Sequence, residues 1–361
     1  MQMSFATDDE RFASFARTLD ALRDDVEARL GPEDVAHIRR IGRVSRAAEI
    51  LGRGLIFVSL DPLSFGAGVA ALWLHKVLEL MEIGHTSLHG TYDRLEGAER
   101  YRAKSFYWKA PIDERSWRNH HNGKHHQHAN VLGRDPDLDF GGLRLSAYVS
   151  YRPIFRHQPL SNFATWLGFA GAINLHVTGL LDVHWGREEP AILHDRSAKG
   201  VRAAHRAAFR KFARYYGREY VLLPLLSGPF FWKTLLGNVL SEVGRDVYAA
   251  ATIYCGHVGA TEFPPDERPK GRGAWYAMQA EGAHDFDVPH VVSILCGALD
   301  RQIEHHLFPT FPPNRLREIT PRVRAACEAH GVRYRTGRWP QRLREVTRTL
   351  RELSRDAILG M

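Results

Sequence analysis

The sequence predicts an all-α protein that is embedded in a membrane. Three observations support this fold class: long apolar stretches, a turn signal between two of them, and amphipathic helical stripes at both ends of the chain. The 361 residues are 25% charged and 44% hydrophobic, which excludes a disordered or low-complexity protein. The net charge of +8 fits an anionic membrane surface or a simple solvated surface, and no nucleic-acid-binding module is recognisable.

The N-terminal stretch predicts an amphipathic helix and not a signal peptide. It is rich in acidic residues and has no apolar run behind a basic start. Apolar residues recur at steps of three and four along one face: Phe12, Phe15, Leu19, Leu22, Val26 and Leu30. The pattern is too short for a partner-binding coiled coil, so we expect this helix to pack on the rest of the protein. Residues 1–45 are therefore assigned to an N-terminal cytoplasmic region.

Two apolar stretches predict a helical hairpin in the membrane. Residues 47–60 and 62–82 flank Asp61-Pro62, which is a turn signal. The alternative interpretation is a soluble all-helical protein with buried helices, since such helices are equally apolar.

Three more apolar segments follow, at residues 160–181, 220–232 and 234–257. The first has no charged side chain over 22 residues and would reach about 33 Å as a helix. The histidines near residues 85–126 and those near the C-terminus must lie on the same side of the membrane if they are to meet. An even number of crossings therefore separates them, so one of the three segments does not cross. The loop 184–219 carries nine Lys and Arg residues, which favours the cytoplasm. We therefore expect 160–181 to dip into or lie on the membrane.

Residues 220–257 then form a second hairpin, which is predicted to turn near Lys233. Arg245 and Asp246 lie inside it and are expected to form a structural pair, because unpaired charges in a membrane are costly. A C-terminal cytoplasmic helix is predicted within residues 336–361, with one apolar stripe: Leu343, Val346, Leu350 and Leu353.

Histidine is the outlier in the composition, with 20 residues, and three short clusters carry the chemistry. They contain His85 and His89, then His121, His125 and His126, and finally His305 and His306. Two of the clusters hold an i, i+4 pair, which places both imidazoles on one helix face. One such pair alone is more often structural than metal-binding, but three clusters beside apolar sequence are a strong signal. Seven ligands exceed one tetrahedral zinc site, so the pattern favours two redox-active metals that act with dioxygen on an apolar substrate.

The sequence resembles the membrane fatty acid desaturases. The segments HTSLH, HNGKHH and QIEHHLFP are similar to the three histidine boxes of that family, and most similar to its Q-x-x-H-H group of bacterial acyl-CoA and front-end desaturases. The resemblance implies a four-transmembrane-helix fold under a cytoplasmic helical cap, over residues 46–335. It also implies two iron ions, with dioxygen as co-substrate, held by these histidines: His85, His89, His121, His125, His126, His257, His305 and His306. Among these, the seven in the three boxes are the expected catalytic residues, and Gln302 is expected to position either a water or a ligand histidine.

Several assignments stay open at this point. His120 and His128 flank the second box and are expected to support the ligands or to lie on the surface, and His284 has no assigned role. A nearby acidic run either orients ligand imidazoles or forms a solvated loop: Asp135, Asp137 and Asp139. The same site could instead serve a hydroxylase or a ketolase, or the chain could be a non-catalytic metal-binding membrane protein.

Desaturation by dioxygen needs two electrons from outside, and the sequence shows no cytochrome b5, flavin or iron–sulfur motif. We therefore expect a separate electron donor such as ferredoxin with its reductase. The other expected partners are membrane lipid and a fatty acyl substrate, carried as acyl-CoA or acyl-lipid, without nucleic acid. The expected location is a bacterial inner membrane, with the site facing the cytoplasm.

Overall fold

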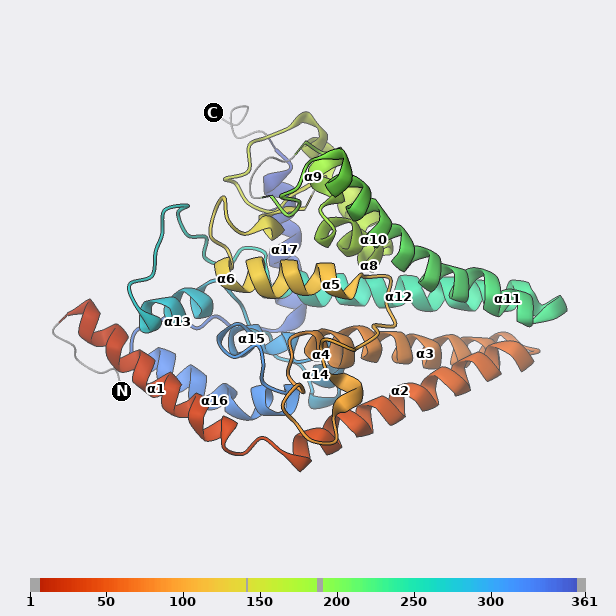
Figure 1. Ribbon diagram of the computed structural model, residues 1–361, viewed down its shortest axis with the longest axis horizontal. Helices are drawn as coiled ribbons and strands as arrows, with labels where there is room; N and C mark the ends of the chain where they lie inside the picture. The colour runs from red at the N-terminus through yellow and green to blue at the C-terminus, as the bar shows by residue number, and fades with distance from the viewer. Residues whose placement is uncertain (1–6, 141, 187–190, 356–361) are drawn as a thin grey trace.

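The computed structural model describes residues 7–140, 142–186 and 191–355, and this part of the chain is almost entirely helical (Figure 1). Within it, the strands are limited to one antiparallel pair of two residues each: β1 (Asp139–Phe140) and β2 (Leu143–Arg144). The predicted all-α fold class is confirmed.

The first hairpin consists of α2 (Pro32–Val58), α3 (Pro62–Leu78), the π-helix η1 (Glu79–His85) and α4 (Thr86–Leu88). Asp61 begins α3, because its Oδ1 accepts hydrogen bonds from the backbone N–H groups of Leu63 and Ser64. The two helices approach closely at Gly52 and Gly68, where an added Cβ would lie 2.6 Å and 2.8 Å from a backbone nitrogen of the other helix. A hairpin turning at Asp61-Pro62 is thus confirmed, although α2 begins well before the apolar stretch.

The second hairpin consists of α10 (Ala198–Tyr216), η6 (Gly217–Leu222), α11 (Leu223–Leu226), η7 (Gly228–Phe230) and α12 (Phe231–His257). Two expectations about it were wrong. The basic stretch 184–219 is not a loop, because α10 occupies most of it; one of its nine basic residues, Arg187, lies outside the described residues. The turn lies at residues 227–230 and not near Lys233, because Gly228 adopts a φ of +54° and is followed by a proline.

Both hairpins end at the same tip of the molecule, on the right of Figure 1. Lys233 joins them there, since its Nζ donates hydrogen bonds to the carbonyl oxygens of Phe57 (2.9 Å) and Ser59 (2.7 Å) at the end of α2. Large apolar side chains are exposed around the tip, among them Leu60 and Leu63. Such a contiguous apolar surface is typical of contact with lipid.

Among the described residues, one helical segment is long and apolar enough to cross a membrane by length and composition, at Pro62–Leu88. The other long helices of the two hairpins carry several charged side chains along their length. Four membrane-spanning helices therefore remain an expectation from the family resemblance.

A buried ion-pair network fills the space between the hairpins. Lys76 of α3 lies 3.2 Å from Glu219 of η6 and 2.8 Å from Glu242 of α12. Arg245 is fully buried and contacts Glu242 at 3.1 Å and Asp246 at 2.8 Å, which confirms the expected Arg245–Asp246 pair. The network connects elements from both hairpins and matches each buried charge with an opposite one.

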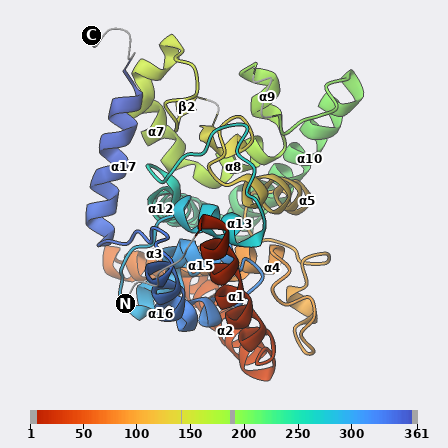
Figure 2. The same ribbon diagram turned by 90° about the vertical axis from the view of Figure 1, so that its left-hand side faces the viewer.

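The remaining helices form a cap over the other end of the hairpins. On one side, α1 (Asp8–Glu27) packs on α13 (Arg272–Glu281), α15 (Gln302–Leu307) and α16 (Pro313–Ala329) through a shared apolar cluster. The expected N-terminal stripe forms this contact, with Phe15, Leu19, Leu22 and Val26 buried. Figure 2 shows α17 (Trp339–Leu353) along the side of the molecule, where it packs on α12 and α7 with Val346 and Leu350 buried.

The apolar segment 160–181 is not one helix. It is divided at Gly168 into α7 (Gln158–Leu167) and α8 (Phe169–Val177), and a short helix, α9 (Leu180–His184), follows. Leu160 and Phe163 of α7 are exposed, whereas α8 buries Phe169 and His176 against the interior. The apolar residues of segment 160–181 therefore pack partly in the core, and they are not all available for contact with lipid.

Short elements complete the fold. They are η2 (Glu99–Tyr101), α5 (Glu114–Trp117), η3 (Arg118–His125), α6 (His126–His128), η4 (Pro136–Leu138), η5 (Pro153–His157), α14 (His290–Cys296) and η8 (Leu299–Arg301). Two of them, η3 and α6, carry the histidines of the second cluster.

We predict that Lys76→Met lowers the free energy of unfolding by about 3–5 kcal/mol, because Glu219 and Glu242 would lose their shared buried cation. Thermal melting of the purified protein in detergent measures this effect. Lys199→Met removes an exposed lysine at the start of α10 and serves as the control. Equal melting temperatures for the two variants would contradict a stabilising role for the network.

Candidate metal centre

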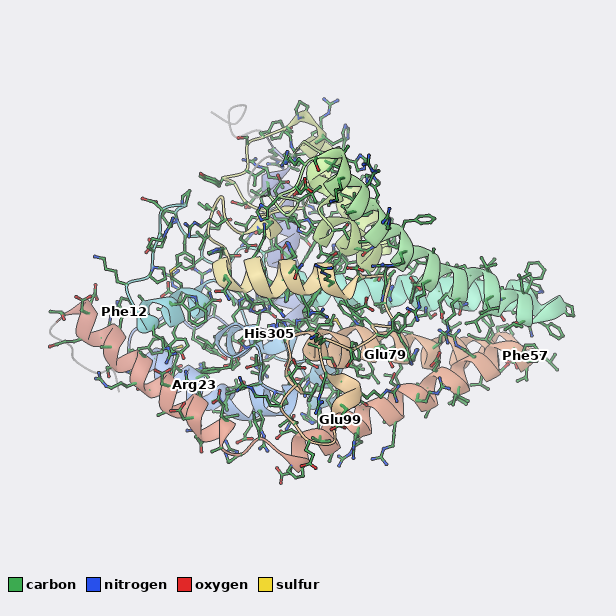
Figure 3. All side chains as sticks on the ribbon, viewed as in Figure 1. Phe12, Arg23, Phe57, Glu79, Glu99 and His305 are labelled. Carbon is green, nitrogen blue, oxygen red and sulfur yellow. The ribbon has the colours of Figure 1, made fainter. Side chains whose placement is uncertain are left out.

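Three sequence clusters and the end of α12 bring eight histidines together near the centre of the molecule. Figure 3 labels His305 there, with Glu79 between it and Phe57 at the tip. The eight are His85, His89, His121, His125, His126, His257, His305 and His306, which are all the histidines that the sequence singled out as metal ligands. Six are buried, and His121 and His257 are half-buried.

Two π-helices determine how these imidazoles face one another. His85 ends η1, and its Nε2 lies 3.2 Å from that of His89. In η3 the backbone N–H of His126 bonds to the carbonyl of His121, so residues five apart share a face. His121 therefore pairs with His126, Nε2 to Nε2 at 3.2 Å, and its ring also stacks on that of His125, with centroids 5.1 Å apart, as the i, i+4 spacing predicts.

The ligand atoms gather in two groups. In the first, the ring nitrogens of four histidines lie within 4.8 Å of one another: His85, His89, His121 and His305. In the second, the same limit holds for His125, His257 and His306. The His126 ring lies between the groups, stacked on His306 with ring centroids 4.4 Å apart and 4.7 Å from His89.

The donor set fits bound metal ions. Pairs of imidazole nitrogens about 3 Å apart can flank one ion at a metal–nitrogen distance of about 2.1 Å. The Nε2 of His305 is buried and has no hydrogen-bond partner in the described part of the chain. Burial, together with the neighbouring imidazoles, holds the pKa values of His126, His305 and His306 well below the ordinary value, which keeps the neutral form that binds metals.

Two carboxylates hold His125 in place. Its Nδ1 lies 3.1 Å from Asp135 Oδ2 and 3.3 Å from Asp137 Oδ2. Burial acts to lower the pKa of His125, but the two carboxylates outweigh it and raise this pKa to about 9. The carboxylates hold Nδ1–H, so that Nε2 can bind a metal once it gives up its own proton, in the way that carboxylates orient ligand histidines in metalloproteins. Asp139 differs, because its carboxylate contacts Arg152.

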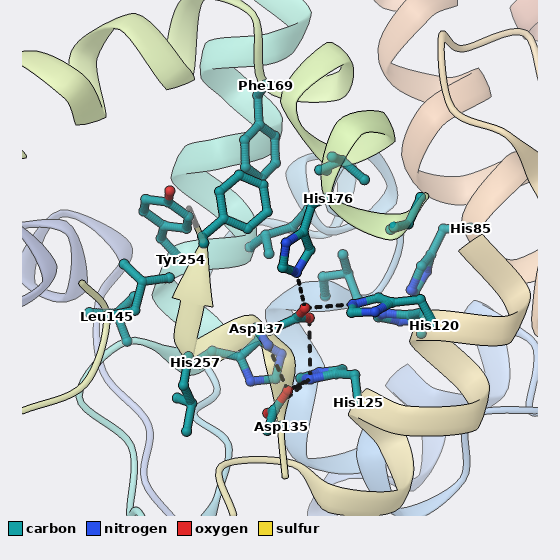
Figure 4. Close-up of a pocket in the computed structure, with 18 of the residues that line it drawn as sticks. His85, His120, His125, Asp135, Asp137, Leu145, Phe169, His176, Tyr254 and His257 are labelled. Carbon is teal, nitrogen blue, oxygen red and sulfur yellow. Dashed lines mark hydrogen bonds and ion pairs between the residues drawn. The ribbon is translucent and has the colours of Figure 1, made fainter. Parts of the chain in front are cut away.

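Asp137 also links His125 to two histidines outside the boxes. Its Oδ1 accepts hydrogen bonds from Nε2 of His120 (2.6 Å) and Nε2 of His176 (2.8 Å), as Figure 4 shows. Sequence reasoning missed His176, because it lies in an apolar stretch without a motif. His120 is buried in this cluster, in the supporting position that the sequence allowed for it.

Two glutamine side chains contact ligand histidines of the second group. Gln302 Nε2 donates to Nε2 of His257 at 2.7 Å, and Gln279 Oε1 lies 3.0 Å from Nδ1 of His306. Gln302 thus contacts one of the expected ligand histidines, whereas no sequence signal marked Gln279. His128 and His284 lie outside both groups.

An apolar cavity adjoins the two histidine groups (Figure 4). Its walls include His85, His121, His125 and His257 as well as aromatic and aliphatic side chains from several elements: Trp108, Ile112, Leu145, Phe169, Ile173 and Tyr254. A concave apolar space with a few convergent polar groups is typical of a binding site for an apolar substrate.

We predict that Asp135→Asn or Asp137→Asn weakens metal binding by about 10–100-fold, because a neutral amide holds the His125 imidazole less firmly. Competition with a chelator, followed by elemental analysis of the purified protein, measures this loss. Asp139→Asn makes the same chemical change at the neighbouring carboxylate that pairs with Arg152, and it should retain full metal content. Identical metal affinity in all three variants would contradict the positioning role.

Comparison with known proteins shows to which family the chain belongs. The fatty acid desaturase family profile matches residues 62–338. An NADPH-dependent stearoyl-CoA 9-desaturase of Mycobacterium tuberculosis is 33% identical over 355 residues, which cover 96% of this chain and 81% of the relative. An acyl-lipid (9-3)-desaturase of Borago officinalis is 36% identical over 67% of this chain and 53% of its own length, and an acyl-lipid 8-desaturase of Rebecca salina is 28% identical over 65% and 50%. Because the profile covers most of the chain and the mycobacterial relative aligns over nearly all of it, the chain belongs to the fatty acid desaturase family.

Proposed function

We propose that this protein inserts a double bond into a fatty acyl chain in an oxygen-dependent reaction. The observation that carries the proposal is the position of the apolar cavity, whose wall is formed in part by histidines of both groups. An acyl chain in this cavity would place a methylene pair beside the metal ligands. The names of the relatives, which are acyl-CoA and acyl-lipid desaturases, support the same reaction.

Two metal ions are proposed to occupy the two histidine groups, and iron fits the oxidative chemistry that zinc cannot perform. The first group would hold one ion with His85, His89, His121 and His305. The second would hold the other with His125, His257 and His306, and His126 lies where it can serve either. When bound, the iron pair would supply dioxygen activation and the removal of two hydrogen atoms from the acyl chain.

The protein's own part is to orient the ligands and to exclude water. Trp117 packs on His121 with ring centroids 4.3 Å apart, and Trp108 donates its indole N–H to the carbonyl of Glu79 at 2.9 Å. Both indoles line the cavity and are themselves buried. A rigid apolar wall restricts the conformations of a flexible chain, which raises the chance that one methylene pair faces the metals.

The electrons are proposed to come from a separate donor such as ferredoxin with its reductase. Each turnover consumes two external electrons, because the substrate supplies only two of the four that reduce dioxygen to water. The family is membrane-associated, and we propose that the tip lies in the membrane and the cap in the cytoplasm. The exposed arginines of α10, which include Arg202, Arg206 and Arg210, favour that orientation.

Gas chromatography–mass spectrometry of lipids from an expressing host tests the reaction. We expect a new unsaturated fatty acid, and we expect its loss in Ala variants of His85, His121, His125, His257, His305 and His306. His205→Ala changes an exposed histidine of α10 and should retain the product. Hydroxylated or keto products would assign the site to the alternative oxidation, and full activity in most of the box variants would overturn the proposal. With purified enzyme, multiple turnovers should require an added reductase and carrier.

Cysteine labelling tests the orientation. A membrane-impermeant maleimide should fail to label Lys199→Cys, at the start of α10, in intact cells and should label it once the cells are permeabilised. The native thiols give little background, because Cys255, Cys296 and Cys327 are all buried. Labelling of Lys199→Cys with equal efficiency before and after permeabilisation would contradict a cytoplasmic cap.

A further inference from the structure

Two neighbouring residues in the wall of the apolar cavity are exposed, and we take them to mark its opening. Most residues of its wall are buried or half-buried, whereas Gly259 and Glu262 are exposed. Both follow the end of α12 and lie a few residues beyond His257. A substrate whose tail fills the cavity must therefore have its head group near Gly259.

A second, polar hollow adjoins this opening. It shares Val258 and Gly259 with the apolar cavity, and its other wall is formed by the segment before α17 and by one face of α17 itself. Three arginines line it, Arg335, Arg342 and Arg348, against a single acidic residue, Glu345. The hollow is therefore positively charged at the point where the head group emerges.

The hollow contains buried hydrogen-bond donors without partners. Arg342 is buried; its guanidinium contacts Glu345 and the carbonyl oxygens of Cys255 and Val258, while its Nε has no partner in the described chain. His284 is only 2% exposed, and its Nε2 accepts a hydrogen bond from Arg335 Nη1 at 3.3 Å. That bond leaves the proton on Nδ1, which is also buried and has no partner.

Unpaired buried donors are costly unless a ligand satisfies them. Burial and the two neighbouring arginines lower the pKa of His284 to about 2, so this imidazole is a neutral donor and adds no charge. Arg348 is an exposed arginine of the hollow: 71% of its side chain is exposed, and its nearest carboxylate, Glu352, lies 3.9 Å away. A pair of arginines that border an open, positively charged hollow is well suited to bind the oxygen atoms of a phosphate group.

We propose that this hollow binds a phosphate group of the carrier to which the acyl chain is attached. The inference rests on the proposed desaturase function and extends it, because it places the recognition of the carrier on α17 and on the segment before it. The phosphate would belong either to a coenzyme A thioester or to a glycerophospholipid, since both join an acyl chain to a phosphodiester or diphosphate. The tail would then enter past Gly259 while the phosphate stays with Arg335 and Arg348.

Equilibrium binding and kinetics of an Arg335→Gln/Arg348→Gln variant test this proposal. The first probe is free coenzyme A, and the second is dipalmitoyl phosphatidylcholine in nanodiscs with and without competing coenzyme A. We expect the variant to bind one of these phosphate-bearing probes more weakly by on the order of tenfold or more, as the loss of charge-assisted hydrogen bonds implies. The probe that loses affinity identifies the carrier.

The kinetic arm compares stearoyl-CoA with the stearoyl thioester of N-acetylcysteamine, which has no phosphate. We expect the variant to raise KM for the phosphate-bearing substrate and to leave kcat and the KM of the phosphate-free thioester unchanged. Arg344→Gln, on the outer face of α17, removes a charge without touching the hollow and should change neither.

Unchanged affinity for both probes, or an equal rise in KM with and without phosphate, would overturn the proposal. These outcomes are distinct from failure of the proposed function, in which the unmodified enzyme would desaturate neither the two thioesters nor the palmitoyl chains of the nanodisc lipid, whatever its affinity for the probes.

Discussion

The structure depends on holding eight imidazoles close together in the interior and pointed at one another. Nitrogen atoms that face each other at 3.2 Å, as in His85–His89 and His121–His126, repel or share one proton unless a metal lies among them. The chain therefore needs rigid supports behind each ring. It obtains them from four separate parts of the sequence, and the order of helices around the centre follows from this requirement.

The supports are polar groups that pair with one another. Asp137 connects His125 to His120 and His176, so a ligand from the second box is joined to helix α8 at the cavity wall. Between the hairpins, Lys76 pairs with carboxylates of η6 and α12, and Arg245 pairs with Asp246 of its own helix. These networks cost desolvation energy, but they allow few alternative packings, which is useful where a metal centre requires fixed ligand directions.

The proposed function depends on the two spaces that adjoin the histidine groups, the apolar cavity and the polar hollow. The same end of α12 supplies His257 to the second histidine group, Tyr254 to the apolar cavity, and Val258 to the polar hollow before α17. One helix terminus thus connects the region for chemistry, the region for the acyl tail and the region that we assign to the carrier. Substrates that differ in their head group would be distinguished beside α17, while the metal ligands stay unchanged.

The sequence by itself determined the helical class, the first hairpin with its turn at Asp61, and seven of the eight histidines, because each is encoded by local spacing or by a motif. The eighth, His257, followed from the family resemblance. Only the tertiary structure decided which nitrogens meet. The π-helical turn of η3 pairs His121 with His126, and His176 joins the site from an apolar segment that resembles a membrane helix. Helical periodicity describes only one face of one helix. The contacts of His176 and of the histidine pairs arise when elements that are distant in the sequence pack together and bury their polar groups in the same space.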